Sequence, residues 1–418
     1  MNVAITNAAL RTIGLGSRFF LAIFMARFLT LHDVGTFALM AGAAGLLPSV
    51  AGFGLNFFMA RRMVGIEHEE AVDIARNRLL ISILAGALCS AIIFALVQRG
   101  ILQLPFSPWL AIAILMLELL GFDLQVALLA RSRSTFANLL LFFRNGAWVV
   151  PFIALAWAIP SLRTIEALAW FWLGGIVLSH IFMAWRYADD YRTIFRWPDP
   201  HRGAFAASVG ASAAKIYLSD LGLAGSVYLD RFIISSLEGM RAAGIYFFYA
   251  SIVNSAYVIC LAATVQVYQP ELRAAFVAGG IPGLRNALRT RFRRTALLTA
   301  GALTAAAPAT YVAALMSGKA DIITAFNIVP VLLAAYGVKM LSDFMSTALA
   351  AAEKDMHYAI FNMAGLCLTV IGCLAFIPAL GILGAAVAAL ASATILLVLR
   401  LASWRRMETG AFASQAVT

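Results

Sequence analysis

The sequence predicts an all-α polytopic membrane protein in which twelve transmembrane helices form two pseudo-symmetric six-helix bundles around a central cationic cavity. Three observations lead to this prediction: an apolar composition, a one-sided distribution of basic residues and an echo between the two halves. Hydrophobic residues make up 62% of the chain and charged residues 12%, and the mean hydropathy is +0.89. A soluble globular domain has about a quarter of its residues charged, so that class is excluded.

The predicted helices are stretches with about the 20 mostly apolar residues that cross roughly 30 Å of hydrocarbon. They cover residues 3–29, 34–60, 79–98, 108–130, 135–159, 165–187, 206–236, 242–269, 295–316, 325–350, 357–377 and 381–403.

The basic residues in the loops and at the inner ends of these spans are distributed unequally between the two sides. Twenty of them, Arg78 and Arg400 included, fall on one side, and only Arg99, Arg163, Arg241 and Lys319 fall on the other. Because Lys and Arg accumulate in cytoplasmic loops, we expect both termini in the cytoplasm. The pI near 9.9 does not indicate nucleic-acid binding, since the basic residues are not gathered into a solvated patch with aromatic platforms.

The loops and motifs argue against an enzyme. The outer loops are too short for a catalytic or receptor domain, and two inner loops, 61–78 and 271–294, alternate apolar and charged residues in a way typical of helices on the bilayer surface. The four cysteines lie within spans without metal-ligand spacing. The sequence has no P-loop, HExxH, CxxC or GxSxG motif. We therefore expect no enzyme activity, no metal and no cofactor. A removable signal peptide is not expected either, since basic residues interrupt the first apolar stretch.

The two halves resemble each other at an offset of 204 residues. Arg11 then aligns with Lys215, and Arg27-Phe28 with Arg231-Phe232. The pattern predicts an N-terminal bundle at 1–190, a cytoplasmic linker at 191–205 and a C-terminal bundle at 206–418. Parallel repeats of this kind hold a midplane site between bundles that rock for alternating access.

Charged residues inside the spans are the candidate functional residues, because a charge in hydrocarbon costs several kcal/mol and usually faces a wet cavity or a partner. Apart from Glu166, Arg186 and Arg400 near the ends of their spans, seven basic and five acidic residues lie there, and this positive excess predicts an anion-binding cavity. Arg27 and Arg231 lie at helix ends, where we expect them to snorkel to the interface. The predicted substrate-binding residues are Arg11, Arg18, Arg144, Lys215 and Lys339. The predicted ion-coupling residues are Glu118, Asp123, Asp220 and Asp343, with H⁺ or Na⁺ as the candidate ion.

Two interpretations stay open for most of these charges. Arg11 and Arg18 are seven residues apart, so they share one face of their helix about 10 Å apart; they either face substrate or pair with acids on neighbouring helices. Arg144 has no acid within one helical turn. Lys339 and Asp343 share a face as an i,i+4 pair. They form either a structural ion pair or a switch in which ion uptake by Asp343 releases Lys339 to hold an anion.

Two stretches resemble a known family. The segment ARFLTLHDVGTFALMAGAAGLLPSVAGFGLNFFMARR (26–62) resembles the Wzx-like polysaccharide transporter family of the MOP (MATE-like) flippase superfamily, in which a glycine opens the second helix and basic residues end it. The segment YLDRFIISSLEGMRAAGIYFFYASIV (228–253) is similar to the junction between the seventh and eighth helices of that family, including Asp230, Gly239, Gly244 and Tyr246.

The resemblance implies a flippase for O-antigen or exopolysaccharide biosynthesis. Such a protein moves a polyprenyl-pyrophosphate-linked oligosaccharide from the inner to the outer leaflet of the bacterial cytoplasmic membrane, and its cationic lumen holds the pyrophosphate. The implied partners are this lipid-linked substrate, membrane lipids and the polysaccharide polymerase and chain-length machinery; we expect a monomer. Two further helices, found in peptidoglycan-precursor flippases of the superfamily, are absent here.

Two rival functions remain at this point. A multidrug or small-metabolite cation-coupled antiporter of the same superfamily shares the twelve-helix plan, but cationic drugs favour a net acidic cavity. A membrane polymerase or ligase acting on the same lipid needs a sizeable outer loop, which this chain lacks.

Overall fold

The structure, a computed structural model, describes residues 3–100, 104–188, 205–352 and 355–415, and in these ranges it is helical without any strand. It divides into two compact units, unit 1 (residues 1–224) and unit 2 (residues 225–418). The boundary falls inside one long helix, α10 (Phe205–Ala263). The linker predicted at 191–205 lies almost wholly outside the described residues.

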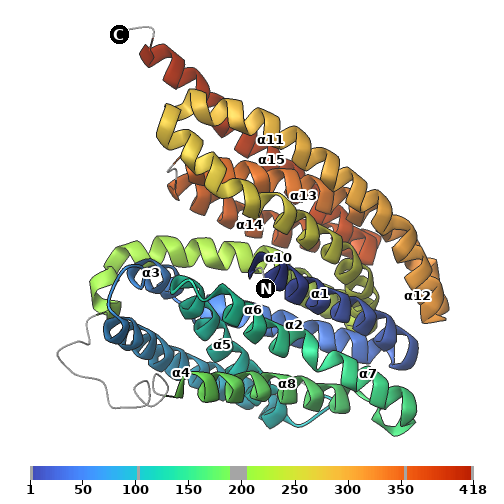
Figure 1. The fold of residues 1–418 in the computed structure, drawn as a ribbon. Coiled ribbons are helices and arrows are strands. Elements are labelled where there is room, and N and C mark those ends of the chain that lie inside the picture. Colours follow the sequence, from blue (N-terminus) through green and yellow to red (C-terminus); the bar gives the residue numbers. More distant parts are fainter. Residues whose placement is uncertain (1–2, 101–103, 189–204, 353–354, 416–418) are drawn as a thin grey trace. The chain divides into compact units, whose positions relative to one another are not determined.

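Unit 1 is built around one central helix, α5, which packs against α2, α3, α4, α6 and α8 (Figure 1). Its bounds, Pro108–Ala130, are those that hydropathy predicts. The other elements of this unit are α1 (Val3–Phe28), α2 (Leu31–Val50), α3 (Leu55–Arg62), α4 (His68–Gln98), α6 (Ser134–Phe142), η1 (Phe143–Ala147), α7 (Val149–Ala158), η2 (Pro160–Leu162), α8 (Ile165–Arg186) and the first part of α10.

Unit 2 is centred on α13 (Ile328–Ala351) and α15 (Ile382–Gln415), which pack against each other. On their other sides, α11 (Val265–Ser317) covers α13, and α14 (Asp355–Leu380) covers α15. Two short elements, α12 (Ala320–Thr324) and η4 (Ala325–Asn327), lead into α13. The remainder of α10 completes the unit, and Gly239 within it adopts a left-handed φ of 85°, which glycine tolerates without strain.

Local sequence sets the start and end of α2. Thr30 caps the helix: its side-chain oxygen accepts from the Asp33 amide at 3.1 Å, and its own amide donates to the Asp33 carboxylate at 3.2 Å. The helix ends at Val50 because the chain then passes through two left-handed residues, Phe53 with φ 50° and Gly54 with φ 70°. The single helix predicted at 34–60 is therefore two helices, α2 and α3.

The structure also differs from the prediction at the two loops, 61–78 and 271–294, in which separate surface helices are expected. Residues from His68 onward form the first turns of α4, which continues without a break to Gln98. The second loop belongs to α11, whose backbone leaves helical geometry at Gly279 and at Gly280 with φ 58°. Alternating polarity correctly indicates helix in both places, but it carries no information on whether the helix is separate from the next span.

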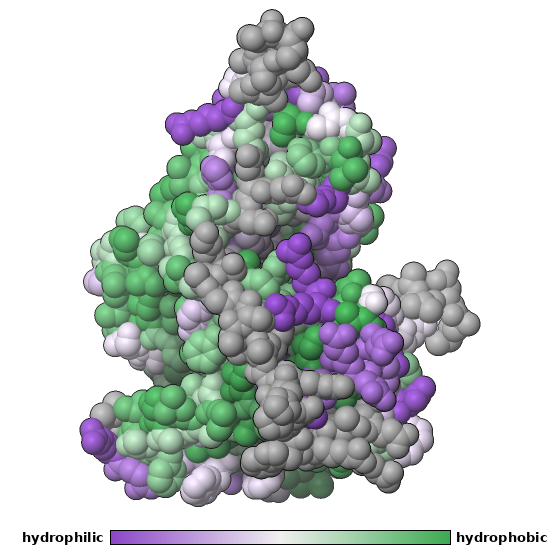
Figure 2. All heavy atoms as spheres, turned by 90° about the vertical axis from the view of Figure 1, so that its left-hand side faces the viewer, coloured by the Kyte–Doolittle hydropathy of each residue, from purple (hydrophilic) through white to green (hydrophobic). Residues whose placement is uncertain are grey.

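The surface is that of a multi-pass membrane protein. Nine described segments are long and apolar enough to cross a membrane, and one of them, 216–317, contains two of the predicted spans and most of a third. Large hydrophobic side chains are exposed along the helices, such as Leu84 at 72% and Ile371 at 64%. Figure 2 views the end of the molecule at which α3 ends and α4 begins, where hydrophilic side chains gather beside hydrophobic flanks.

Exposed tryptophans mark the ends of the spans in unit 1. Trp109 opens α5, Trp157 closes α7 and Trp170 lies near the start of α8, and each is more than half exposed. The predicted topology places all three at the outer end. Trp185, 75% exposed, lies in the last turn of α8 at the opposite end. Two levels of exposed Trp are typical of the two membrane–water interfaces.

Candidate functional site

Arg144 is the second residue of a π-helix, η1, inserted between α6 and α7. The extra residue in such a turn changes the direction in which following side chains point, and π-helical turns are frequent at functional sites. Here it aims Arg144 at α5. The guanidinium donates from Nε to a Glu118 carboxylate oxygen at 2.9 Å and from Nη2 to the Glu118 carbonyl at 3.1 Å, and Nη2 also pairs with the carboxylate. Both residues are 4% exposed.

Two tryptophans complete this ion pair. Trp172 Nε1 donates to the second Glu118 carboxylate oxygen at 3.0 Å, and Trp148 Nε1 donates to the Arg144 carbonyl at 3.0 Å. The two rings stack at a centroid distance of 6.4 Å. Both carboxylate oxygens therefore have donors, as a buried charge requires. The sequence correctly places no acid near Arg144 on its own helix, because its partner comes from α5.

Two adjacent glycines in α8 provide a matched test of this arrangement. A Cβ on Gly175 would lie 2.5 Å from Trp148 Cδ1 and 2.8 Å from the Phe143 carbonyl oxygen, whereas a Cβ on Gly174 would meet no heavy atom within 4 Å. We expect Gly175→Ala to lower the free energy of unfolding by about 1–3 kcal/mol through overpacking. Gly174→Ala should leave it unchanged or raise it by up to about 1 kcal/mol. Thermal unfolding in detergent measures both effects. Equal unfolding temperatures for the Gly174→Ala and Gly175→Ala variants would contradict the close contact at Gly175.

A second buried ion pair lies on the same central helix. Arg78 of α4 donates from Nη2 to Asp123 at 3.1 Å and from Nε to the Asn56 side-chain oxygen at 2.8 Å, and the Ser82 hydroxyl donates to Asp123. Arg78 is 0% and Asp123 1% exposed. Counting Arg78 among the loop cations is therefore wrong, because α4 begins three turns earlier than hydropathy indicates. Ser82 lies one turn after Arg78 on the same face of α4. This second polar residue was the sequence signal that the face is buried against another helix.

Unit 2 contains a cluster of three charges around Asp343 of α13. One carboxylate oxygen accepts from Arg400 Nη1 at 3.1 Å, and the other accepts from the Tyr257 hydroxyl at 2.6 Å and faces Lys339 Nζ at 3.4 Å. Arg400 also donates to the Ser342 hydroxyl at 2.8 Å and to the Asn362 side-chain oxygen at 3.3 Å. The cluster thus joins α10, α13, α14 and α15 with two positive charges and one negative charge.

Assigning Arg400 to a cytoplasmic loop is wrong, because this residue is 2% exposed inside α15. The apolar stretch that precedes it continues with Leu401 and Ala402. The predicted span 381–403 already contains Arg400, so the span itself was the signal that this residue lies within the bundle.

Asp230 forms a third polar group, in the motif that carries the family resemblance. Its carboxylate accepts from the Arg231 backbone amide at 2.7 Å and hydrogen-bonds with Tyr246, which is 2% exposed. The Arg231 guanidinium lies over the rings of Tyr228 and Phe247 at 5.3 and 5.1 Å. Cation–π contacts of this kind hold a guanidinium in a fixed position, so the aromatic residues of this motif position its charges.

Comparison with solved structures identifies the fold. An inward-facing structure of a multidrug resistance MATE family transporter of the MOP superfamily matches with a TM-score of 0.69 at 15% identity, covering 97% of this chain and 98% of that chain. An outward-facing structure of such a transporter gives 0.61 at 16% identity, with 98% and 96% covered. The chain has the MATE fold. No protein-family model and no curated protein matches the sequence.

A third structure with the MATE fold differs in the polarity of its binding pocket. It is a MOP superfamily transporter from Pyrococcus furiosus, for which a reversed pocket polarity was taken to suggest a different function. Its TM-score with this chain is 0.56 at 15% identity, with 97% of this chain and 95% of that chain covered. The MATE fold therefore does not by itself determine the charge of the ligand.

Within this MATE fold, the predicted binding residues fall into two groups. Arg144 is buried against Glu118, whereas Arg18 is exposed on α1 and donates to the Asn145 side-chain oxygen, and Lys339 has 27% of its side chain exposed. The side chains of Arg11 and Lys215 lie outside the described part of the structure. Their predicted roles stay predictions.

Of the predicted coupling acids, Glu118, Asp123 and Asp343 are ion-paired, as described above. Asp220 of α10 is partly buried and has no ion-pair partner among the described residues. Within the same ranges, no group of three His, Cys, Asp or Glu side chains is placed to hold a metal ion. An alkali cation or a proton at one of these acids remains the prediction.

Proposed function

We propose that the protein is a flippase for a polyprenyl-pyrophosphate-linked oligosaccharide, which it moves from the inner to the outer leaflet of the bacterial cytoplasmic membrane by alternating access. The observation that carries this proposal is the excess cation at Asp343, whose single carboxylate is shared by Lys339 and Arg400. A positive charge in excess inside a helical membrane bundle favours an anionic ligand. Alternating access is supported by the likeness to inward- and outward-facing MATE structures.

The proposed coupling step uses the same cluster. Lys339 is the more exposed of the two cations, with 27% of its side chain accessible against 3% for Arg400. Uptake of H⁺ or Na⁺ by Asp343 reduces its attraction for Lys339, which then swings to the pyrophosphate while Arg400 stays anchored by Ser342 and Asn362. Loss of the ion restores the pair and releases the substrate. Arg18 supplies a second exposed cation from unit 1.

The alternative function is a cation-coupled multidrug or small-metabolite antiporter. The observation that favours it is the description of the matching MATE structures as multidrug resistance transporters. The two functions differ in a deletion strain: the flippase predicts trapped lipid-linked oligosaccharide, whereas the antiporter predicts altered drug sensitivity with normal glycan sidedness.

Charge reversal at Arg18 tests the proposed function. Arg18→Glu should reduce outward movement of the lipid-linked oligosaccharide by at least about tenfold, because a charge-assisted contact to phosphate becomes a repulsion. Arg99→Glu is the matched control, since Arg99 is also exposed and directly follows the last residue of α4. Sidedness is measured with a membrane-impermeant glycan probe on spheroplasts, and gel filtration of the purified variants checks folding. Normal export by folded Arg18→Glu protein would contradict a substrate-facing role.

A further inference from the structure

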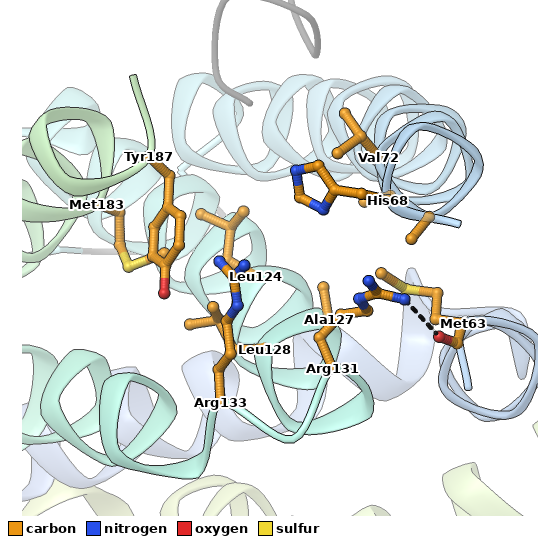
Figure 3. A pocket seen from close by; sticks show the side chains of 12 residues that line it. Met63, His68, Val72, Leu124, Ala127, Leu128, Arg131, Arg133, Met183 and Tyr187 are labelled. Atoms are coloured by element: carbon orange, nitrogen blue, oxygen red, sulfur yellow. Dashed lines mark hydrogen bonds between the residues drawn. The ribbon is translucent and has the colours of Figure 1, made fainter. Parts of the chain in front are cut away.

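A pocket in unit 1 lies outside the ion pairs described above. It opens where α3 ends, α4 begins and α5 and α8 end, at the end of the unit opposite Trp109 and Trp157. Its walls are mostly apolar, with Val72, Leu124 and Met183 among the lining residues. In Figure 3, Arg133 and Tyr187 lie on one side of this pocket, and Arg131 and His68 lie on the other. It thus combines an apolar interior with basic groups at its rim.

A strained turn places the two arginines at this pocket. After α5, the Ser132 amide donates to the Leu129 carbonyl at 3.0 Å and the Arg133 amide donates to the Leu128 carbonyl at 2.8 Å, the bonding pattern of a Schellman motif. The left-handed position of this motif usually belongs to glycine, but here it is held by Ser132 with φ 58°. This tight end of the helix directs both neighbouring arginines toward the pocket.

The polar groups at the pocket have unequal numbers of partners. Arg131 is anchored, because its Nη1 donates to the Ile66 carbonyl at 2.8 Å and to the Met63 carbonyl at 3.4 Å. Arg133 lies with its guanidinium carbon 4.8 Å from the centroid of the Tyr187 ring and has no acid partner among the described residues. The Tyr187 hydroxyl is buried and, within the same ranges, has no hydrogen-bond partner. A cation and an unsatisfied donor therefore converge on one side of the pocket.

The surroundings indicate a lipid rather than a soluble ligand. Trp185, two residues before Tyr187, is 75% exposed, and Val64, next to the lining residue Met63, is 66% exposed. Exposed tryptophan in a membrane protein lies at the headgroup level of the bilayer. A basic pocket between helix ends at this level matches the way in which membrane proteins hold anionic lipid headgroups. An apolar wall gives no advantage to free phosphate, whereas it does to a glycerol backbone with acyl chains.

We propose that this pocket binds an anionic glycerophospholipid, whose phosphate accepts from Arg133 and the Tyr187 hydroxyl while the start of its acyl chains lies against Val72, Leu124 and Met183. The site is separate from the proposed transport pathway, since none of its lining residues belongs to the charge clusters. Its test is therefore independent of the flippase proposal.

The test is lipid binding to the purified full-length protein, measured by native mass spectrometry in detergent with phosphatidylglycerol and with phosphatidylcholine. We expect phosphatidylglycerol to bind about tenfold more tightly, and Arg133→Gln to remove this preference, because one charge-assisted contact is lost. Arg99→Gln, an exposed arginine at the other end of α4, should keep it. Tyr187→Phe keeps the ring and should weaken binding by about fivefold through the lost hydroxyl.

Two results would overturn the proposal. If the wild type, Arg133→Gln and Tyr187→Phe proteins bind phosphatidylglycerol equally, this pocket does not recognise the lipid. Competition by glycerol 3-phosphate at concentrations that match those of the lipid would assign the site to a soluble phosphate. Thermal unfolding of each variant establishes that binding is compared between folded proteins, and Tyr187→Phe provides the answer if Arg133→Gln does not fold.

Discussion

Replacement of Glu118 by alanine should lower the free energy of unfolding by about 3–5 kcal/mol, because it leaves the Arg144 guanidinium buried without its carboxylate. Arg144 is 4% exposed and directs both Nε and Nη2 at this side chain, and Trp172 Nε1 loses its acceptor as well. Denaturant unfolding of the purified protein in detergent measures the loss. Tryptophan fluorescence is a direct reporter, since the affected indole is part of the cluster.

The double variant Glu118→Leu/Arg144→Met separates stability from function. Replacement of a whole buried ion pair by apolar side chains of similar volume is often neutral or stabilising, so this protein should unfold close to the wild type. If Arg144 contacts the pyrophosphate during transport, the stable double variant should still fail to export oligosaccharide. Normal export would make the Arg144–Glu118 pair purely structural and remove Arg144 from the predicted binding set.

Asp343→Asn is expected to have an effect of similar size in unit 2. The substitution leaves Arg400, which is 2% exposed, and Lys339 without their shared carboxylate, and such losses cost about 3 kcal/mol or more. The asparagine oxygen can still accept one hydrogen bond, so the variant should remain folded at low temperature. Transport by this variant should no longer depend on pH or on Na⁺, because the carboxylate that we propose as the ion-binding group is gone.

The matched control is Asp321→Asn. Asp321 pairs with Arg241, but their side chains are 45% and 65% exposed. An exposed pair of this kind contributes about 0–1 kcal/mol, and we expect little change in unfolding or transport. Similar unfolding of the Asp321 and Asp343 variants would mean that solvent already screens the Asp343 cluster, while retained ion dependence in Asp343→Asn would move the coupling role to another acid such as Asp220.

Hydropathy predicts the positions of the helices well, because each span must cover the same thickness of hydrocarbon. The bounds of α5 follow from its apolar run and from Pro108, which suits the first turn of a helix. The break between α2 and α3 is missed, since residues 51–54 are as apolar as a continuous helix and only their backbone angles end it. The left-handed Phe53 could not be predicted from its residue type.

The charged residues were found individually, but of their ion pairs only Lys339–Asp343, one turn apart on a single helix, could be anticipated. Arg78 and Asp123 are 45 positions apart in the chain, and Arg400 and Asp343 are 57 apart. Which of them meet depends on how helices pack, and helix periodicity describes only one helix at a time. The π-helix at Arg144 adds a further difficulty, because an assumed α-helical turn places the guanidinium on a different side.

Glu118 and Asp123 are held from two directions, because five residues along an α-helix correspond to a rotation of about 140°. Arg144 binds one carboxylate from η1, and Arg78 binds the other from α4. Any turn or slide of α5 about its own axis would pull at least one carboxylate away from its arginine. These three elements should therefore move as a rigid body, with amide hydrogen exchange around 118–123 limited to opening of the whole unit. Bending during transport then belongs to places where the backbone already leaves helical geometry, such as Gly239 and Gly279–Gly280.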